Sequence, residues 1–156
     1  MFTISQIEKI SLLSDTVLYP EAVAFIRRMV YEEDCTPLPT SQVMGLLNVA
    51  GAFKYSELHE YVKHQRDRNW PASKSDIKKL YADLEQMLTI MKNKRLKDDF
   101  HLTTDGLNPI EARQEADELM AQLAHDFIQH LVAENGLLAS RQAKERANTR
   151  NRGMKP

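Results

Sequence analysis

Apolar residues recur three and four positions apart through most of the chain, which is the spacing of one face of an α-helix. The clearest run predicts a helix over about 74–97. Its inward-facing residues are Ile77, Leu80, Leu84, Met87 and Met91. Before it, Ser73 with Asp76 three residues on resembles a capping box with Asp in place of Glu. No segment shows a convincing strand pattern, so the sequence predicts an all-α fold.

Two helices are predicted in the first forty residues. Ile4, Ile7, Ile10 and Leu13 give a short helix near 4–14. Pro20 suits the first position of a second helix, where its missing N–H costs nothing. The apolar stripe of that helix is formed by Val23, Ile26 and Val30. Pro37 and Pro39 end it, because a proline disfavours helical geometry in the residue before it.

Two shorter helices follow the prolines. Thr40 or Ser41 caps the first, "SQVMGLLNVA", and Gly51 ends it. Ser56 caps the second, over about 57–68. The inward side of this second helix holds Leu58, Tyr61, Val62 and Gln65.

The last predicted helix has a strong start signal. Asn108, Pro109 and Glu111 supply a cap, a first-turn proline and an acidic third residue. Its apolar face continues through Ala116, Leu119, Leu123, Phe127 and Leu131. Asn135-Gly136 is a normal helix stop. The sequence thus predicts a compact bundle of about six helices over 1–136 and a basic, mobile tail over 137–156.

Length and composition fit one globular domain in a reducing compartment. A chain of 156 residues with 42% apolar residues can bury a core. The single Cys35 cannot form an intramolecular disulfide. The start, "MFTISQIEKIS", lacks the basic and long apolar segments of a signal peptide. No stretch approaches the ~20 apolar residues of a membrane span. We expect a cytoplasmic protein with no membrane partner.

The net charge of −1 is unevenly distributed. Residues 137–156 hold six cations against one carboxylate, Glu145, and carry +5, while 41–100 carry +3. Residues 1–40 carry −3 and 101–136 carry −6. A polyanion would therefore lie against the two basic regions and avoid the two acidic ones.

Residue patterns typical of catalysis are scarce. The five glycines form no phosphate-binding loop, and Cys35 has no zinc-ligand neighbours. His125-Asp126 matches the dyad of metal-dependent phosphohydrolases, but no Asp follows it to complete such a site. Asp126, His130 and Glu134 share one helical stripe that is better explained as a solvated polar face than as a metal site. We therefore expect no enzyme activity, no cofactor and no metal.

The stretch "YVKHQRDRNW", residues 61–70, concentrates positive charge on one helix. Lys63 and Arg66 lie on its outer side, and Arg68 lies near its C-terminus, where a cation is favourable in any case. Periodicity alone favours a solvated charged face over a phosphate contact. Trp70, beside Pro71, either stacks a nucleobase or plugs the end of the helix against the core, and the plug is favoured.

Two short motifs carry a family resemblance. They are "TSQVMGLLNVA" over 40–50 and "YVKHQRDR" over 61–68. Together they resemble the core helix and the following basic segment in the helical small subunit of type III CRISPR effector complexes. The positions that match the basic motif are Tyr61, Val62, Lys63, Gln65 and Arg68. The chain departs from the family pattern at Met44, His64 and Asp67, and the resemblance covers about 30 of 156 residues.

The resemblance implies a helical bundle without a catalytic centre, whose copies stack along a ribonucleoprotein that acts in antiviral defence. The expected partners are RNA or an RNA-containing duplex, held by its backbone, together with other subunits and further copies of the chain. Cations on rigid helices bind phosphates without reading sequence. The nucleic-acid-binding candidates are Lys63, Gln65, Arg66, Arg68, Lys74, Lys78, Arg141 and Lys144.

Two alternative functions remain open from the residues. "SQVMGLLNVAGAFKYSELHEYVKHQ" has two helices around a short turn, as in a helix-turn-helix DNA-binding regulator. Glu57 and Glu60 oppose that interpretation, because they place negative charge where a recognition helix approaches phosphate. The other alternative is a protein-interaction adaptor that binds no nucleic acid.

Overall fold

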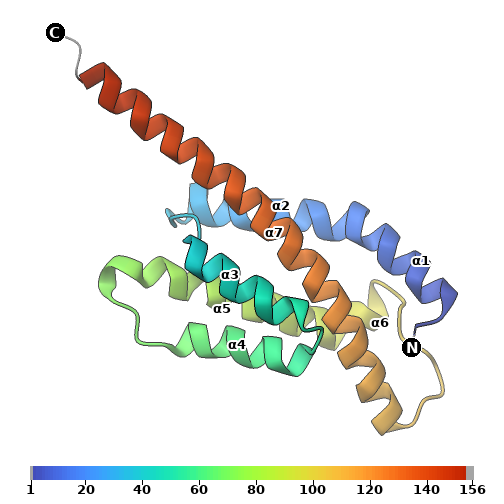
Figure 1. The fold of residues 1–156 in the computed structure, drawn as a ribbon. Helices are drawn as coiled ribbons and strands as arrows, with labels where there is room; N and C mark the ends of the chain where they lie inside the picture. The colour runs from blue at the N-terminus through green and yellow to red at the C-terminus, as the bar shows by residue number, and fades with distance from the viewer. Residues whose placement is uncertain (1, 154–156) are drawn as a thin grey trace.

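The computed structural model describes residues 2–153, and these residues form five helices and no strand (Figure 1). The first helix is continuous through α1 (Ile4–Leu13), the π turn η1 (Ser14–Leu18), α2 (Tyr19–Arg27) and the π turn η2 (Arg28–Glu32). The second and third are α3 (Thr40–Gly51) and α4 (Tyr55–Asp67). The fourth follows the 3-10 turn η3 (Ala72–Lys74) and comprises α5 (Ser75–Ile90), η4 (Met91–Arg95) and α6 (Leu96–Asp98). The fifth is α7 (Pro109–Gly153).

The prediction of a break before Pro20 is wrong, so the described chain has five helices where about six were expected. Pro20 lies in the first turn of α2, directly after a π turn. In that turn the Tyr19 N–H donates to the Ser14 carbonyl oxygen, five residues back. Pro20 has no N–H to donate and would clash within a regular α-helix. The wider π turn accommodates it, so the helix continues without a break.

The predicted caps of α3 and α4 are also wrong. Pro39 is the N-cap of α3, and its carbonyl oxygen accepts the N–H groups of Gln42 and Val43 at 3.0 Å. Lys54 is the N-cap of α4, so Ser56 lies inside the first turn. The helix end predicted at Gly51 is confirmed, because Gly51 is the last residue of α3, and Phe53 beyond it has a left-handed φ of 52°.

The helix predicted over 74–97 is confirmed at 75–98, and four of its five predicted core residues are buried, with Met87 half-buried. The Ser73–Asp76 capping box is absent, because Lys74 is the N-cap. Asp76 instead accepts hydrogen bonds from the N–H of Thr36, at 2.8 Å, and from that of Ile77. Its carboxylate therefore ties the segment after the first helix to the start of α5.

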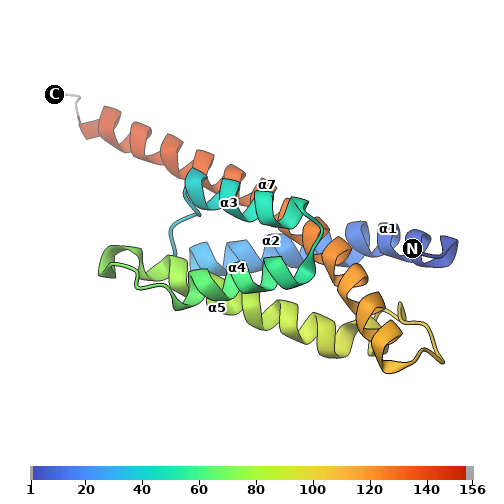
Figure 2. The ribbon, with the colours of Figure 1, turned by 60° about the horizontal axis from the view of Figure 1, so that its bottom comes forward.

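The long helix α7 packs against α2 and α3, while α4 packs antiparallel to α5 (Figures 1 and 2). The core lies between these elements. Its largest fully buried side chains include Tyr81 and Phe127, with Leu18, Ile26, Leu46, Leu58 and Leu84 around them. No helix among residues 2–153 combines the length and the apolar character that crossing a bilayer requires.

The predicted helix stop at Asn135-Gly136 is wrong, because α7 continues through both residues. Asn135 is 2% exposed and bonds a single residue of another segment. Its amide oxygen accepts the Leu38 N–H at 2.7 Å, and its amide nitrogen donates to the Leu38 carbonyl oxygen at 3.1 Å. The side chain thus holds the segment with Pro37, Leu38 and Pro39 against α7. Asn135 therefore makes a tertiary contact and does not end the helix.

The prediction of a mobile tail from residue 137 is replaced by a helix that extends to Gly153, the last described residue. Leu138 is 1% exposed and is the last buried residue of α7. The next two turns still lie beside the segment with the two prolines, since Ala139, Gln142, Ala143 and Arg146 line a pocket with Thr36–Thr40. The end of the helix projects from the bundle (Figure 1). Ala, Arg, Lys, Gln and Glu dominate this end, and all of them favour helix in solvent. We call residues 139–153 the arm.

Candidate nucleic-acid interface

The predicted binding residues fall on two separate surfaces. The first is the α4–α5 turn, by which we mean residues 63–78 at the end of α4, the connection and the start of α5; its surface carries Lys63, Arg66, Arg68, Lys74 and Lys78, whereas Gln65 lies in the interior beneath it. The second is the arm, which carries Arg141 and Lys144. Figure 1 shows that the arm projects beyond the bundle, whereas the α4–α5 turn lies at the end of two packed helices.

The two cations in the last turns of α4 are already paired with carboxylates. Lys63 Nζ lies 3.4 Å from Glu60 Oε1, with the Lys63 side chain partly exposed and that of Glu60 well exposed. Such a surface pair is weak in water and exchanges readily for another anion. Arg66 is held more firmly, with Nε 2.8 Å from Asp67 Oδ1 and Nη1 3.3 Å from Glu85 Oε2. The hydrogen bond to Asp67 raises the pKa of Arg66, so Arg66 remains charged but is largely neutralised.

Glu85 is the centre of a polar network that the sequence analysis missed. His59 Nε2 lies 3.0 Å from Glu85 Oε1, and the Thr89 hydroxyl donates to the same oxygen at 3.0 Å. The hydrogen bond with His59 is the main cause that lowers the pKa of Glu85, and Thr89 and Arg66 add to it. The i, i+4 spacing of Glu85 and Thr89 was visible in the sequence, but the partners on α4 were not. This network fastens the basic end of α4 to α5.

Gln65 is buried and does not face a ligand. Its side chain is in the interior, and its amide oxygen has no hydrogen-bond partner. Its backbone oxygen accepts the indole N–H of Trp70 at 2.7 Å. Trp70 is half-buried against the core, which is the helix-end plug that the sequence favoured.

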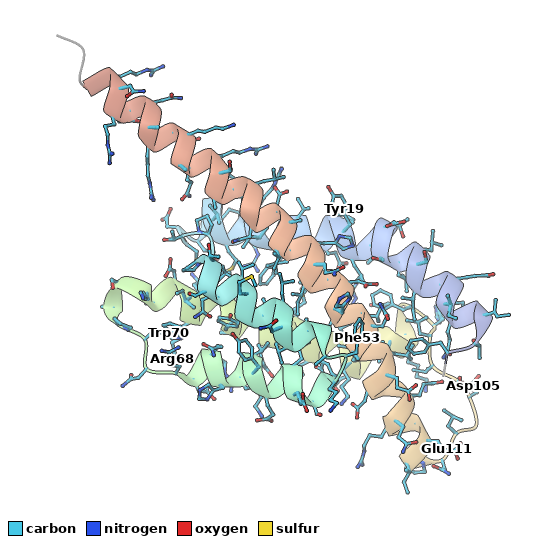
Figure 3. The ribbon with its side chains drawn as sticks, in the orientation of Figure 1. Tyr19, Phe53, Arg68, Trp70, Asp105 and Glu111 are labelled. Atoms are coloured by element: carbon cyan, nitrogen blue, oxygen red, sulfur yellow. The ribbon has the colours of Figure 1, made fainter. Side chains whose placement is uncertain are left out.

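Three exposed cations of the α4–α5 turn have no ion-pair partner among residues 2–153. They are Arg68, Lys74 and Lys78. The Arg68 guanidinium carbon lies over the Trp70 ring, 4.5 Å from its centroid. Figure 3 shows both labelled residues at this turn. These three residues are the available anion contacts of the first surface.

The arm has more unpaired positive charges than the α4–α5 turn. Its cations are Arg141, Lys144, Arg146, Arg150 and Arg152, and its one carboxylate is Glu145. All are exposed, and no described carboxylate lies within ion-pair distance of the five cations. Helical spacing places Arg141, Lys144 and Arg152 on one side of the arm and the other two on the opposite side. Figure 3 shows long side chains on both sides of this end of α7.

The polar residues in the middle of α7 have separate partners. His125 Nδ1 lies 3.3 Å from Asp126 Oδ1, and His130 Nε2 lies 3.1 Å from the Ser14 hydroxyl. Glu134 is buried and accepts a hydrogen bond from Arg27 Nε at 2.8 Å. Within the described part of the chain, no three His, Cys, Asp or Glu side chains are arranged to hold a metal ion.

A shallow groove of about 360 Å³ separates α1 from α7. Ile7, Ile10 and Phe2 form its apolar wall, and Asp15 and Asp126 belong to its polar lining. The helix predicted from the Ile4 and Ile7 spacing is present, but these two side chains are 77% and 54% exposed. This face of α1 is therefore an apolar surface with no covering element in the described chain.

Comparison of the chain with protein-family models, with curated proteins and with solved structures finds no match. The resemblance to the small subunit of type III CRISPR effector complexes therefore stays a prediction.

Proposed function

We propose that the protein is a non-catalytic subunit that binds nucleic acid through backbone phosphates, within a ribonucleoprotein effector complex of the type III CRISPR kind. The observation that carries the proposal is the arm, where five cations on one exposed helix have no ion pair with any described carboxylate. Unpaired surface cations gain little for folding and are free to replace the counterions of a polyanion.

The dimensions of the arm suit a phosphate backbone. Arg141 and Arg152 are eleven residues apart on α7, which corresponds to about 17 Å along a helix that rises 1.5 Å per residue. A duplex carries about ten phosphates over that length. Because cations lie on both sides of the arm, it suits a groove or a bent strand better than a flat surface. Such contacts hold the backbone and do not discriminate sequence.

The arrangement of α3 and α4 does not favour the helix-turn-helix alternative. The two helices run antiparallel in both views (Figures 1 and 2), whereas the helices of that motif cross steeply. The adaptor alternative has one observation in its favour, the exposed Ile4 and Ile7 on α1. In our proposal this apolar surface contacts another subunit of the complex, while the arm contacts RNA.

The test measures fluorescence anisotropy of a labelled single-stranded RNA as the protein is titrated at several salt concentrations. The arm variant replaces Arg146, Arg150 and Arg152 with Gln. We expect weaker binding for unrelated sequences alike, and a salt dependence of log K that is flatter by about 2, at about 0.7 per lost contact. Thermal unfolding should be unchanged, because these side chains are exposed and lie beyond the last buried residue.

The matched control removes the same amount of charge elsewhere. Lys94, Lys97 and Arg113 are exposed and have no ion pair within the described chain. Replacing these three with Gln should leave the salt dependence as in the wild type. An equal loss of affinity in both triple variants would show that only net charge matters and would refute the arm as a binding surface. A dimer that prefers one DNA duplex would support the regulator instead, and a complete lack of binding would support the adaptor.

A further inference from the structure

In the α4–α5 turn an arginine side chain lies over the ring of an anchored tryptophan. Trp70 is anchored on one side by packing against the core and by its indole N–H, which donates to the Gln65 carbonyl oxygen at 2.7 Å. The guanidinium of Arg68 lies over the ring, 4.5 Å from the centroid. The backbone N–H of Arg68 also donates to the His64 carbonyl oxygen at 2.9 Å, which fixes the start of the turn to α4.

Arg68 is held there without an anionic partner. Its neighbour Asp67 pairs with Arg66, and no other described carboxylate lies within ion-pair distance of Arg68. Arg68 is exposed, and so are Lys74 and Lys78 on the next elements of the chain. The Arg68 side chain is therefore accessible from solvent, and two further exposed cations follow it within ten residues of the chain.

A planar cation supported by an aromatic ring is a surface on which a nucleobase stacks. Unpaired bases stack on aromatic rings and on arginine guanidinium planes, whatever their sequence. A base within a duplex has both faces covered by its neighbours and is not available to an exposed turn. A stacking contact of this kind therefore favours single-stranded over duplex nucleic acid. Lysine side chains alone bind the phosphates of either.

We propose that Arg68, supported by Trp70, stacks an unpaired nucleobase, and that Lys74 and Lys78 contact the adjacent phosphates. This inference rests on the proposed function and deepens it, since it makes a single strand the substrate of the α4–α5 turn. Stacking on one base contributes a factor of about 5 to 150 in affinity.

The experiment uses the full chain and two readouts. Trp70 is the only Trp among the 156 residues, so intrinsic Trp fluorescence reports on this turn alone. The probes are a labelled oligouridine and an RNA duplex with the same number of phosphates. We expect the oligouridine to change the Trp emission over the concentration range in which its own anisotropy rises, and we expect the duplex to leave the emission unchanged.

The variant Arg68→Lys keeps the positive charge and removes the planar guanidinium group. It should bind the oligouridine about 5- to 150-fold more weakly and bind the duplex as the wild type does. Arg113→Lys is the matched control, because Arg113 is an exposed arginine two residues after Glu111 in α7, and Figure 3 shows Glu111 far from Arg68 and Trp70. It should change neither affinity.

Two results would overturn the inference while leaving the proposed function intact. One is a saturated oligouridine complex with unchanged Trp emission, and the other is an Arg68→Lys variant with wild-type affinity for the single strand. If the wild-type protein gives no anisotropy change with either probe, the proposed function fails, and the stacking contact fails with it.

Discussion

Replacing Gly136 with Ala tests whether α7 runs unbroken into the arm. Gly136 is exposed and lies within the helix. Among the described glycines only Gly106 has a positive φ, at 80°. A Cβ added to Gly136 would meet no heavy atom within 4 Å. Alanine is therefore accommodated here without a clash and without backbone strain.

The sign of the effect distinguishes a continuous helix from a helix stop. In a helix interior Ala is favoured over Gly by about 1 kcal/mol, because Gly loses more backbone entropy on folding. No contact is lost at this exposed site, so we expect the free energy of unfolding to rise by about 0.5–1 kcal/mol. At 2–4 °C per kcal/mol, the Tm should rise by about 1–4 °C. If Gly136 ended the helix in the left-handed conformation, Ala would instead cost about 1 kcal/mol or more.

The assay is urea unfolding followed by far-UV circular dichroism, with thermal unfolding as a second measure. Gly106→Ala is the matched control, because the same side chain is introduced at a glycine whose φ is 80° and whose surroundings are equally open. This control should lower the free energy of unfolding by about 1 kcal/mol. A Gly136→Ala variant destabilised as much as Gly106→Ala would refute the continuous helix.

Three further predictions concern the interior. Asn135→Ala should lower the free energy of unfolding by about 2–4 kcal/mol, since it leaves the N–H and C=O of Leu38 buried and unpaired; a loss below 0.5 kcal/mol, typical of surface changes, would contradict this. Leu84→Ala should cost about 2–5 kcal/mol by opening a cavity at a fully buried position, again measured in urea. The pKa of Glu85 is lowered mainly by His59, so its stabilising effect is present above about pH 4.3 and is lost as pH falls through the lower folded-state value. Wild-type stability should therefore fall more steeply on acidification than that of Glu85→Gln, and parallel pH profiles would show that the network contributes nothing.

The sequence predicted the helical faces because they depend on local spacing. Leu80 and Leu84 of α5 and Leu123 and Phe127 of α7 are buried as the three- and four-residue repeat requires. The ends of helices were less predictable. The partner of Asn135 is Leu38, 97 positions away, so nothing near the Asn-Gly pair indicates that its amide is used within the fold.

The predicted helix break before Pro20 was wrong for a related reason. Pro20 is a typical first-turn residue, and the structure does place it in the first turn of α2. What the local rule could not show is that a π turn joins this helix to the preceding one. Leu18, at the end of that turn, is fully buried, so packing of the whole segment against α7 stabilises the continuous helix.

The candidate interface was predicted in part. The basic stretch from Lys63 to Arg68 is where the sequence placed it, yet its charges are not equivalent. Arg66 is neutralised by Asp67 and by Glu85 of a different helix, whereas Arg68 has no carboxylate partner among the described residues. Spacing along one helix cannot separate these two cases, because Asp67 is adjacent to both arginines in the sequence and Glu85 comes from α5.

Backbone amide NMR of the protein with and without single-stranded RNA shows whether the arm and the α4–α5 turn bind RNA. We expect helical amide shifts for residues 141–153 in the free protein, and RNA-induced shifts that are confined to 141–153 and to residues 66–78. If the signals of both segments stay in place while the RNA is shown to be bound, neither segment is part of the binding surface. Disordered shifts over 141–153 in the free protein would contradict the helical arm itself.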